Sequence, residues 1–133
     1  MAGNPAQKIK PFFLMKILME KTDEQHPMTL AQIMTELAAY GVNPERKSLY
    51  TDFELLRKFG VDVETTRDKT TRYYIASRTF ELPELKLLVD AVQSSRFVSE
   101  KKSGELTGKL VSLTSEAQAK QLKRRLFVPR QIP

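Results

Sequence analysis

Residues 29–60 constrain the fold more than any other part of this chain, because they combine two amphipathic helical patterns with a very short link. The link consists of Gly41, Val42 and Asn43. Glycine readily takes the left-handed conformation that ends a helix, and an apolar residue after it folds back on the preceding turn. Two helices joined in this way predict a helix-turn-helix.

The first helix of this pair is predicted to begin at Thr29. The Thr29 side chain can accept a hydrogen bond from the amide three residues on, where Gln32 can complete a capping box. Apolar residues then recur at helical spacing and predict one buried stripe, which comprises Leu30, Ile33, Met34 and Leu37.

The second helix is predicted to span residues 44–58, with Asn43 as its cap and Pro44 at its first position. One face is apolar at i, i+4 and i+7, namely Leu49, Phe53 and Leu56, and the opposite face carries Lys47, Thr51, Glu54 and Lys58. A helix of this kind can enter the major groove of DNA, where its early residues meet the base edges. Each basic residue taken singly is more typical of a solvated helix face.

A β-hairpin, or wing, is predicted to follow. Residues 61–64 alternate between apolar and polar, and residues 72–76 form a second β-rich run. Between them, the wing segment 65–72 carries hydroxyls and the basic residues Arg67 and Lys69, and both kinds of group contact phosphate oxygens. We therefore expect the wing to contact the DNA backbone, although a solvated hairpin loop has much the same composition.

Composition limits the class of protein. The 133 residues suffice for one small domain and an appendage, and the net charge of +6 favours polyanionic partners. With no cysteine, and with His26 as the only histidine, the sequence predicts no metal site, no cofactor and no catalytic residues, so an enzyme is the least expected class. No apolar run reaches the roughly 18 to 20 residues that cross a bilayer, and we expect a cytoplasmic protein without membrane contact.

Helices are also predicted on both sides of this unit. Residues 11–21 form an opening helix that packs over the other two, with its aromatic side chains in the core, and residues 22–28 form a loop that exposes His26. After Ser77, three further helices are predicted, one from Pro83 to the serines at 94 and 95, one over residues 101–113, and one capped by Ser115 and ended by Pro129. Their apolar stripes comprise Leu85, Leu88, Val89 and Val92, then Leu106, Leu110 and Leu113, then Ala119, Leu122 and Leu126.

These later helices have little else in the chain to pack against. We expect them to form a homodimer contact, because helix-turn-helix proteins commonly pair two recognition helices across a two-fold axis. The alternative is that they fold onto the winged unit. Their last helix carries the basic run Lys120, Lys123, Arg124 and Arg125, which could contact phosphate but is more typical of a solvated face.

Two segments resemble a known family. Residues 46–52, RKSLYTD, resemble the "RRTIYRDI" recognition helix of bacterial WYL-domain transcriptional regulators, and residues 80–97, FELPELKLLVDAVQSSRF, resemble the linker that follows their wing. With the winged unit, the resemblance covers nearly all of the chain from Lys8 onward. It implies that Ser48 and Tyr50 contact phosphate and that Lys47 and Thr51 point into the groove. Thr51 stands where the family often has arginine, so the base preference of the family does not transfer directly.

Members of this family usually continue into a β-rich domain that bears the Trp-Tyr-Leu motif and is thought to sense nucleotide-like or nucleic-acid ligands. This sequence has no tryptophan and ends at Pro133. It is therefore either part of a longer regulator or a short relative, and the ending Arg124, Arg125, Leu126, Phe127, Val128 and Pro129, which resembles the approach to that domain, favours the first. An effector ligand would bind the WYL domain.

The combined expectation is an α+β, mostly α protein: a winged helix-turn-helix over residues 8–78, followed by a helical linker or dimerisation segment over residues 79–128. Its expected function is sequence-specific binding of double-stranded DNA as a transcriptional regulator, and the alternative is a winged-helix module that binds another protein. The expected DNA contacts are Arg46, Lys47, Ser48, Tyr50, Thr51, Arg67, Lys69 and Arg72.

Overall fold

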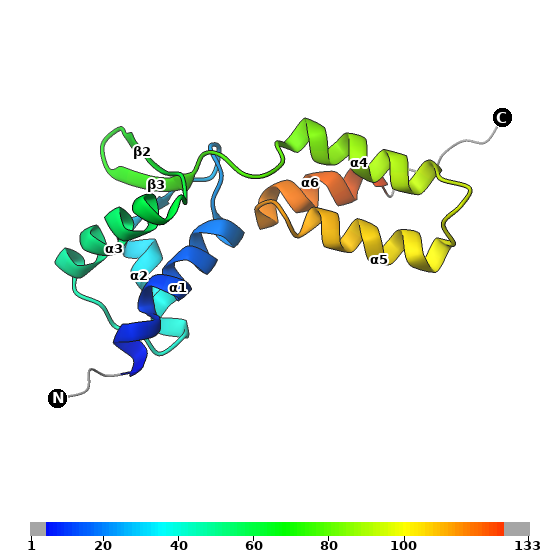
Figure 1. The fold of residues 1–133 in the computed structure, drawn as a ribbon. Coiled ribbons are helices and arrows are strands. Elements are labelled where there is room, and N and C mark those ends of the chain that lie inside the picture. The colour runs from blue at the N-terminus through cyan, green and yellow to red at the C-terminus, as the bar shows by residue number, and fades with distance from the viewer. Residues whose placement is uncertain (1–4, 127–133) are drawn as a thin grey trace. The chain divides into compact units, whose positions relative to one another are not determined.

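The computed structural model describes residues 5–126 and shows an α+β, mostly helical protein (Figure 1). The described part of the chain contains six helices and one small antiparallel sheet of three strands. It divides into two compact units, with the boundary between Ser77 and Arg78. The expected fold class is confirmed at this level, and the first unit is compatible with a winged-helix arrangement.

The opening helix, α1 (Pro5–Lys21), begins earlier than predicted and contains Pro11 in its interior. Lys10 explains this difference, because its buried ammonium group forms an ion pair with Asp52 and so holds the turn before Pro11 in place. The expectation that the aromatic side chains of α1 lie in the core is wrong for Phe12, which is 66% exposed. Phe13 is partly buried and stacks on Tyr40 with ring centroids 4.5 Å apart.

The next helix, α2 (Leu30–Ala39), begins as predicted. The Gln32 amide donates to Thr29 Oγ1 at 3.2 Å and the Thr29 amide donates to Gln32 Oε1 at 2.9 Å, so the capping box is confirmed. The predicted ending is confirmed too, since Gly41 has a φ of 78° and the amide of buried Val42 donates to the Leu37 carbonyl at 3.0 Å.

The following helix, α3 (Arg46–Phe59), begins two residues later than predicted. Its N-cap is Glu45 with extended backbone angles, not Asn43. Pro44 is buried within the link, and this packing overrides its preference for the first position of a helix. Gly60 ends α3 as predicted, with a φ of 108°.

The predicted hairpin consists of β2 (Val63–Arg67) and β3 (Thr71–Ile75), which pair in antiparallel register. Its tip is shorter than predicted, because the strands continue to Arg67 and resume at Thr71. The sequence did not predict β1 (Met28–Thr29), which pairs with β3 and gives the sheet order β1-β3-β2. A strand of two residues is too short to leave a periodic pattern in a sequence.

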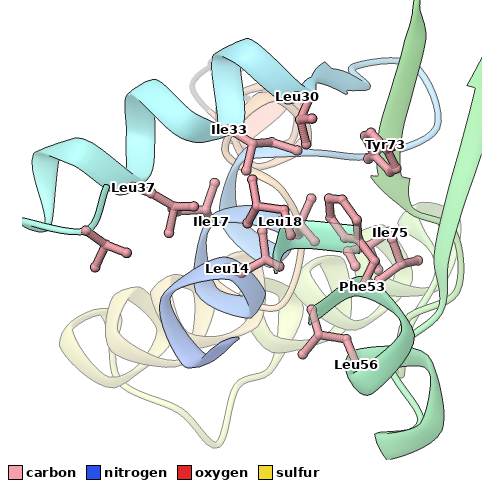
Figure 2. Close-up of a cluster of buried hydrophobic side chains, with 13 residues drawn as sticks. Leu14, Ile17, Leu18, Leu30, Ile33, Leu37, Phe53, Leu56, Tyr73 and Ile75 are labelled. Carbon is pink, nitrogen blue, oxygen red and sulfur yellow. The ribbon is translucent and has the colours of Figure 1, made fainter. Parts of the chain in front are cut away.

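The core of the first unit gathers apolar side chains from α1, α2, α3 and the sheet (Figure 2). Phe53 and Tyr73 stack within it with ring centroids 4.2 Å apart. The predicted stripes of α2 and α3 are confirmed except at Met34, which is only partly buried. The buried cluster comprises Leu14, Ile17, Leu18, Leu30, Ile33, Leu37, Val42, Leu49, Phe53, Leu56, Val63, Tyr73 and Ile75.

The second unit contains α4 (Leu82–Ser94), α5 (Glu100–Val111) and α6 (Glu116–Leu126). The expectation that these helices have little to pack against is wrong, because they bury Leu85, Val89, Val111 and Leu122 in a cluster of their own. Ser115 caps α6 as predicted, accepting from the Gln118 amide at 3.2 Å. Leu113 follows α5 and is 43% exposed, contrary to its predicted place in the stripe. The expectations for Phe127, Val128 and Pro129 lie outside the described residues, as does the side chain of Leu126.

Candidate nucleic-acid interface

The exposed face of α3 is set by its buried stripe. Because Leu49, Phe53 and Leu56 point into the core, the opposite side of the helix faces solvent. Lys47 and Thr51 lie on this side, near the start of the helix, and both are exposed. Arg46 and Tyr50, the other exposed residues of α3 that were predicted as DNA contacts, lie at its edge toward the hairpin, and Tyr50 is 50% exposed.

Ser48 is also a predicted DNA contact, but it lies in a different environment. Its hydroxyl donates to the Glu45 carbonyl and accepts from Lys10 Nζ, each at 2.8 Å. The Lys10 ammonium group also lies 2.9 Å from Asp52 Oδ2, and the Lys10 side chain is only 5% exposed. Ser48 therefore links the first turn of α3 to α1, and the single proton of its hydroxyl is already donated within the protein.

Arg57 connects α3 to the hairpin. Its Nε donates to the Val63 carbonyl at 2.9 Å, which holds the start of β2 against the last turn of α3. Its guanidinium also forms an ion pair with Glu54 on the exposed side of the helix. This pairing partly neutralises a carboxylate that would otherwise repel a phosphate near the same face.

A cavity of about 260 Å³ lies between the first turn of α2, the start of α3 and the hairpin. Arg46 and Tyr50 of α3 meet Thr70 and Thr71 of the hairpin around it, so two of the predicted contacts share one hollow. Leu30 and Ala31 also border it, and their amides belong to a helical turn that has no intrahelical acceptors. A cation, a phenol, hydroxyls and first-turn amides together can hold one phosphate group.

The remaining predicted contacts lie along the hairpin. Arg67, at the end of β2, and Lys69, in the tip, are exposed. Arg72 is half-buried on β3, opposite Thr66 of β2 and Thr29 of β1. The structure therefore brings Arg46 and Tyr50 together, whereas the half-buried Ser48 donates its hydroxyl proton to the Glu45 carbonyl.

Sequence reasoning missed Thr29 and Tyr73 as cavity residues and Lys10 as a support of α3. Burial raises the pKa of the Tyr73 phenol above its ordinary value of 10.0. Tyr73 is therefore neutral near pH 7. Of these residues, only Thr29 could have been found from the sequence, because it was predicted as the cap of α2. A cap residue lies at the N-terminus of its helix, which is the end where anions bind.

A second hollow, of about 310 Å³, lies between α1 and α3 and is almost entirely apolar. Phe12, Leu55 and Phe59 line it and remain exposed. Lys8 is the only charged residue among its lining residues, so this hollow lacks the groups that bind phosphate.

Positive charge is unevenly divided between the two units. The sequence of Met1–Ser77 contains eleven basic and ten acidic residues, whereas Arg78–Pro133 contains eleven basic and only six acidic residues. Most of the net charge of +6 therefore belongs to the second unit, although the first unit carries the predicted DNA contacts.

Comparison with known proteins identified no relative. No protein-family model matches this chain, and searches among curated proteins and solved structures found no match. The resemblance of residues 46–52 and 80–97 to WYL-domain regulators stays a prediction from the sequence. Among residues 5–126, no group of three or more histidine, cysteine or acidic side chains is arranged to hold a metal ion. The helices of the same region include none with the length and apolarity that crossing a membrane requires.

Proposed function

We propose that the first unit is a winged helix-turn-helix that binds double-stranded DNA and reads its sequence, as the DNA-binding part of a transcriptional regulator. The observation that carries this proposal is the cavity where Arg46 and Tyr50 of α3 meet the threonines of the hairpin. A phosphate held there would place the start of α3 beside the DNA backbone, with the exposed face of the helix toward a groove.

The proposal gives different roles to different residues. Lys47 and Thr51 lie on the exposed face of α3 and contact base edges, and Arg46 and Tyr50 contact a phosphate. Arg67, Lys69 and Arg72 of the hairpin contact the flanking backbone. Ser48 keeps α3 in position, since its hydroxyl accepts from Lys10 and donates its only proton to the Glu45 carbonyl.

The proposed assembly is a homodimer with two α3 helices in successive major grooves, roughly 34 Å apart. Such a dimer would select a palindrome with half-sites about 10 base pairs apart. An effector would act through a WYL domain outside this sequence.

The test is selection of random duplex DNA by the purified chain, followed by titration of the winning sequence and a scrambled duplex. We expect a palindrome to be enriched. Lys47→Ala should reduce the preference over the scrambled duplex, by about 1 to 3 kcal/mol for one good base contact. Arg67→Ala should weaken both duplexes by a similar factor.

Two results would contradict the proposal. Equal affinity for all duplexes, unchanged by Lys47→Ala, would favour the alternative of a protein-interaction module. Turnover of a nucleotide or ester by the purified chain would instead indicate an enzyme.

A further inference from the structure

We propose that the exposed face of α6 is a second binding surface for nucleic acid, which contacts the phosphodiester backbone without reading its sequence. Lys120, Lys123 and Arg124 form this surface, hereafter the α6 basic face. This role of the second unit does not depend on the sequence-specific DNA binding that we propose for the first unit.

The geometry of α6 gathers the three cations on one side. They lie at i, i+3 and i+4, so they are neighbours on the helix surface, and all three are exposed. Leu122 is 4% exposed and Ala119 packs against the same core, so the side of α6 that carries these two residues faces the core of the second unit.

Glu116, one turn before Lys120, is the only carboxylate of α6 near this charge. Glu116 is the last acidic residue of the sequence, and residues 117–133 contain five basic residues and no acidic one. Within residues 5–126, none of the three cations takes part in an ion pair. In the first unit, by contrast, Lys10, Lys16 and Arg57 are each paired with a carboxylate.

The spacing of these cations suits a phosphate backbone. From Lys120 to Arg124 the helix rises about 6 Å, which corresponds to roughly two nucleotides along one DNA strand. Flexible, exposed lysine and arginine side chains that neutralise phosphates release counterions, and this release supplies affinity that does not depend on sequence.

A membrane surface fits the same face less well. Helices that lie in a membrane interface combine basic residues with large apolar residues that insert between the lipids. The exposed residues of α6 near its basic face, Glu116 and Gln121 among them, are polar, and Leu122 is committed to the core of the unit. Nucleic acid is therefore the polyanion that this face fits.

The experiment compares the salt dependence of duplex binding in two triple variants of the full chain. The first variant, Lys120→Gln/Lys123→Gln/Arg124→Gln, removes the α6 basic face. The matched control, Lys86→Gln/Lys101→Gln/Lys109→Gln, removes the same charge from exposed positions of α4 and α5. Affinity for one scrambled duplex is measured from about 50 to 200 mM salt, where phosphate contacts dominate binding.

We expect the first variant to reduce the slope of log affinity against log salt by about 2 to 3, because each lost phosphate contact removes about 0.9. The control should leave the slope almost unchanged, and Lys120→Arg/Lys123→Arg should keep the original slope. Equal effects of the two triple variants would overturn the proposal, because net charge alone would then explain the binding. An unchanged slope in the first variant would also overturn it.

A parallel measurement uses vesicles of which about one third is phosphatidylserine. We expect no binding that depends on the α6 basic face, and vesicle binding lost only in the first variant would reassign the face to membranes. If the intact chain bound all duplexes equally, the proposed function of the first unit would be contradicted. The role of α6 would still be decided by the salt dependence of affinity for the scrambled duplex.

Discussion

At the scale of single residues, Lys10 is the side chain that most clearly links stability to the candidate interface. Its ammonium group is buried, pairs with Asp52 and donates to Ser48 in the first turn of α3. The sequence could not predict this role, because a lysine before Pro11 has the pattern of a solvated residue and its partners lie far along the chain. The side chain of a buried cation is positioned by tertiary contacts, which periodicity does not encode.

Replacing Lys10 by methionine should lower the free energy of unfolding by about 3 kcal/mol, because Asp52 would remain buried without its partner. Urea unfolding followed by circular dichroism measures this change. Lys16→Met is the matched control, because the Lys16–Glu20 pair is exposed, and its effect should stay below about 1 kcal/mol. Lys10→Met/Asp52→Leu should recover most of the loss. Equal losses for Lys10→Met and Lys16→Met would show that the buried ion pair has no special role.

Tyr73 should make stability sensitive to alkaline pH. Burial raises its pKa in the folded state, so the neutral phenol is favoured there. The stabilisation is complete below the unfolded pKa of about 10.0 and is lost as pH rises through the higher folded value. Urea unfolding at pH 8 and at pH 10.5 should therefore show a smaller alkaline loss in Tyr73→Phe than in the original chain. An identical loss in both proteins would assign the alkaline sensitivity to other groups.

At the scale of elements, patterns that depend on local chemistry were predicted well. The capping box at Thr29, the left-handed glycines and the apolar stripe of α3 all follow from neighbouring residues, and the structure confirms each. The predicted start of α3 was wrong because the packing of Pro44 decides it, and the early start of α1 was missed because it depends on the ion pair of Lys10. The short strand β1 was missed because it forms by pairing with β3. Within the candidate site, the exposed face of α3 was predicted, but the shared cavity depends on how the hairpin returns to α2 and α3.

Two glycines should respond to alanine substitution with opposite signs. Gly60 has a φ of 108° and open space where an added methyl group would lie, so Gly60→Ala should cost about 1 to 2 kcal/mol through backbone strain alone. Gly108 lies within α5 with equally open space, and Gly108→Ala should add about 0.5 to 1 kcal/mol because glycine disfavours helix interiors. Hydrogen exchange of α3, which Gly60 ends, and of α5, which contains Gly108, measures the two changes. Effects of the same sign would contradict this account.

At the scale of the whole molecule, each unit has its own core. The buried apolar cluster of the first unit contains thirteen described residues, and that of the second contains four. A unit with a smaller buried apolar core gains less free energy of folding, and units of different stability unfold separately. The helices of the second unit should therefore be easier to open than those of the first.

Hydrogen exchange followed by mass spectrometry in mild urea checks this expectation. Amides of α4, α5 and α6 should exchange before those of α1, α2 and α3. Val89→Ala should speed exchange in the second unit alone, because Val89 is buried in that cluster. A single cooperative opening of all six helices, shifted as a whole by Val89→Ala, would contradict separate units.

The bond between Thr22 and Ile75 has a consequence for synthesis of the chain. The Ile75 amide donates to Thr22 Oγ1 at 3.0 Å across a separation of 53 residues, and the Thr22 hydroxyl donates to the Leu18 carbonyl at 2.6 Å. At about 5 to 20 residues per second, a ribosome needs about 3 to 10 s to travel from one residue to the other. For that interval the apolar face of α1 has no sheet to cover it, so we expect α1 to complete its packing only after β3 has been made.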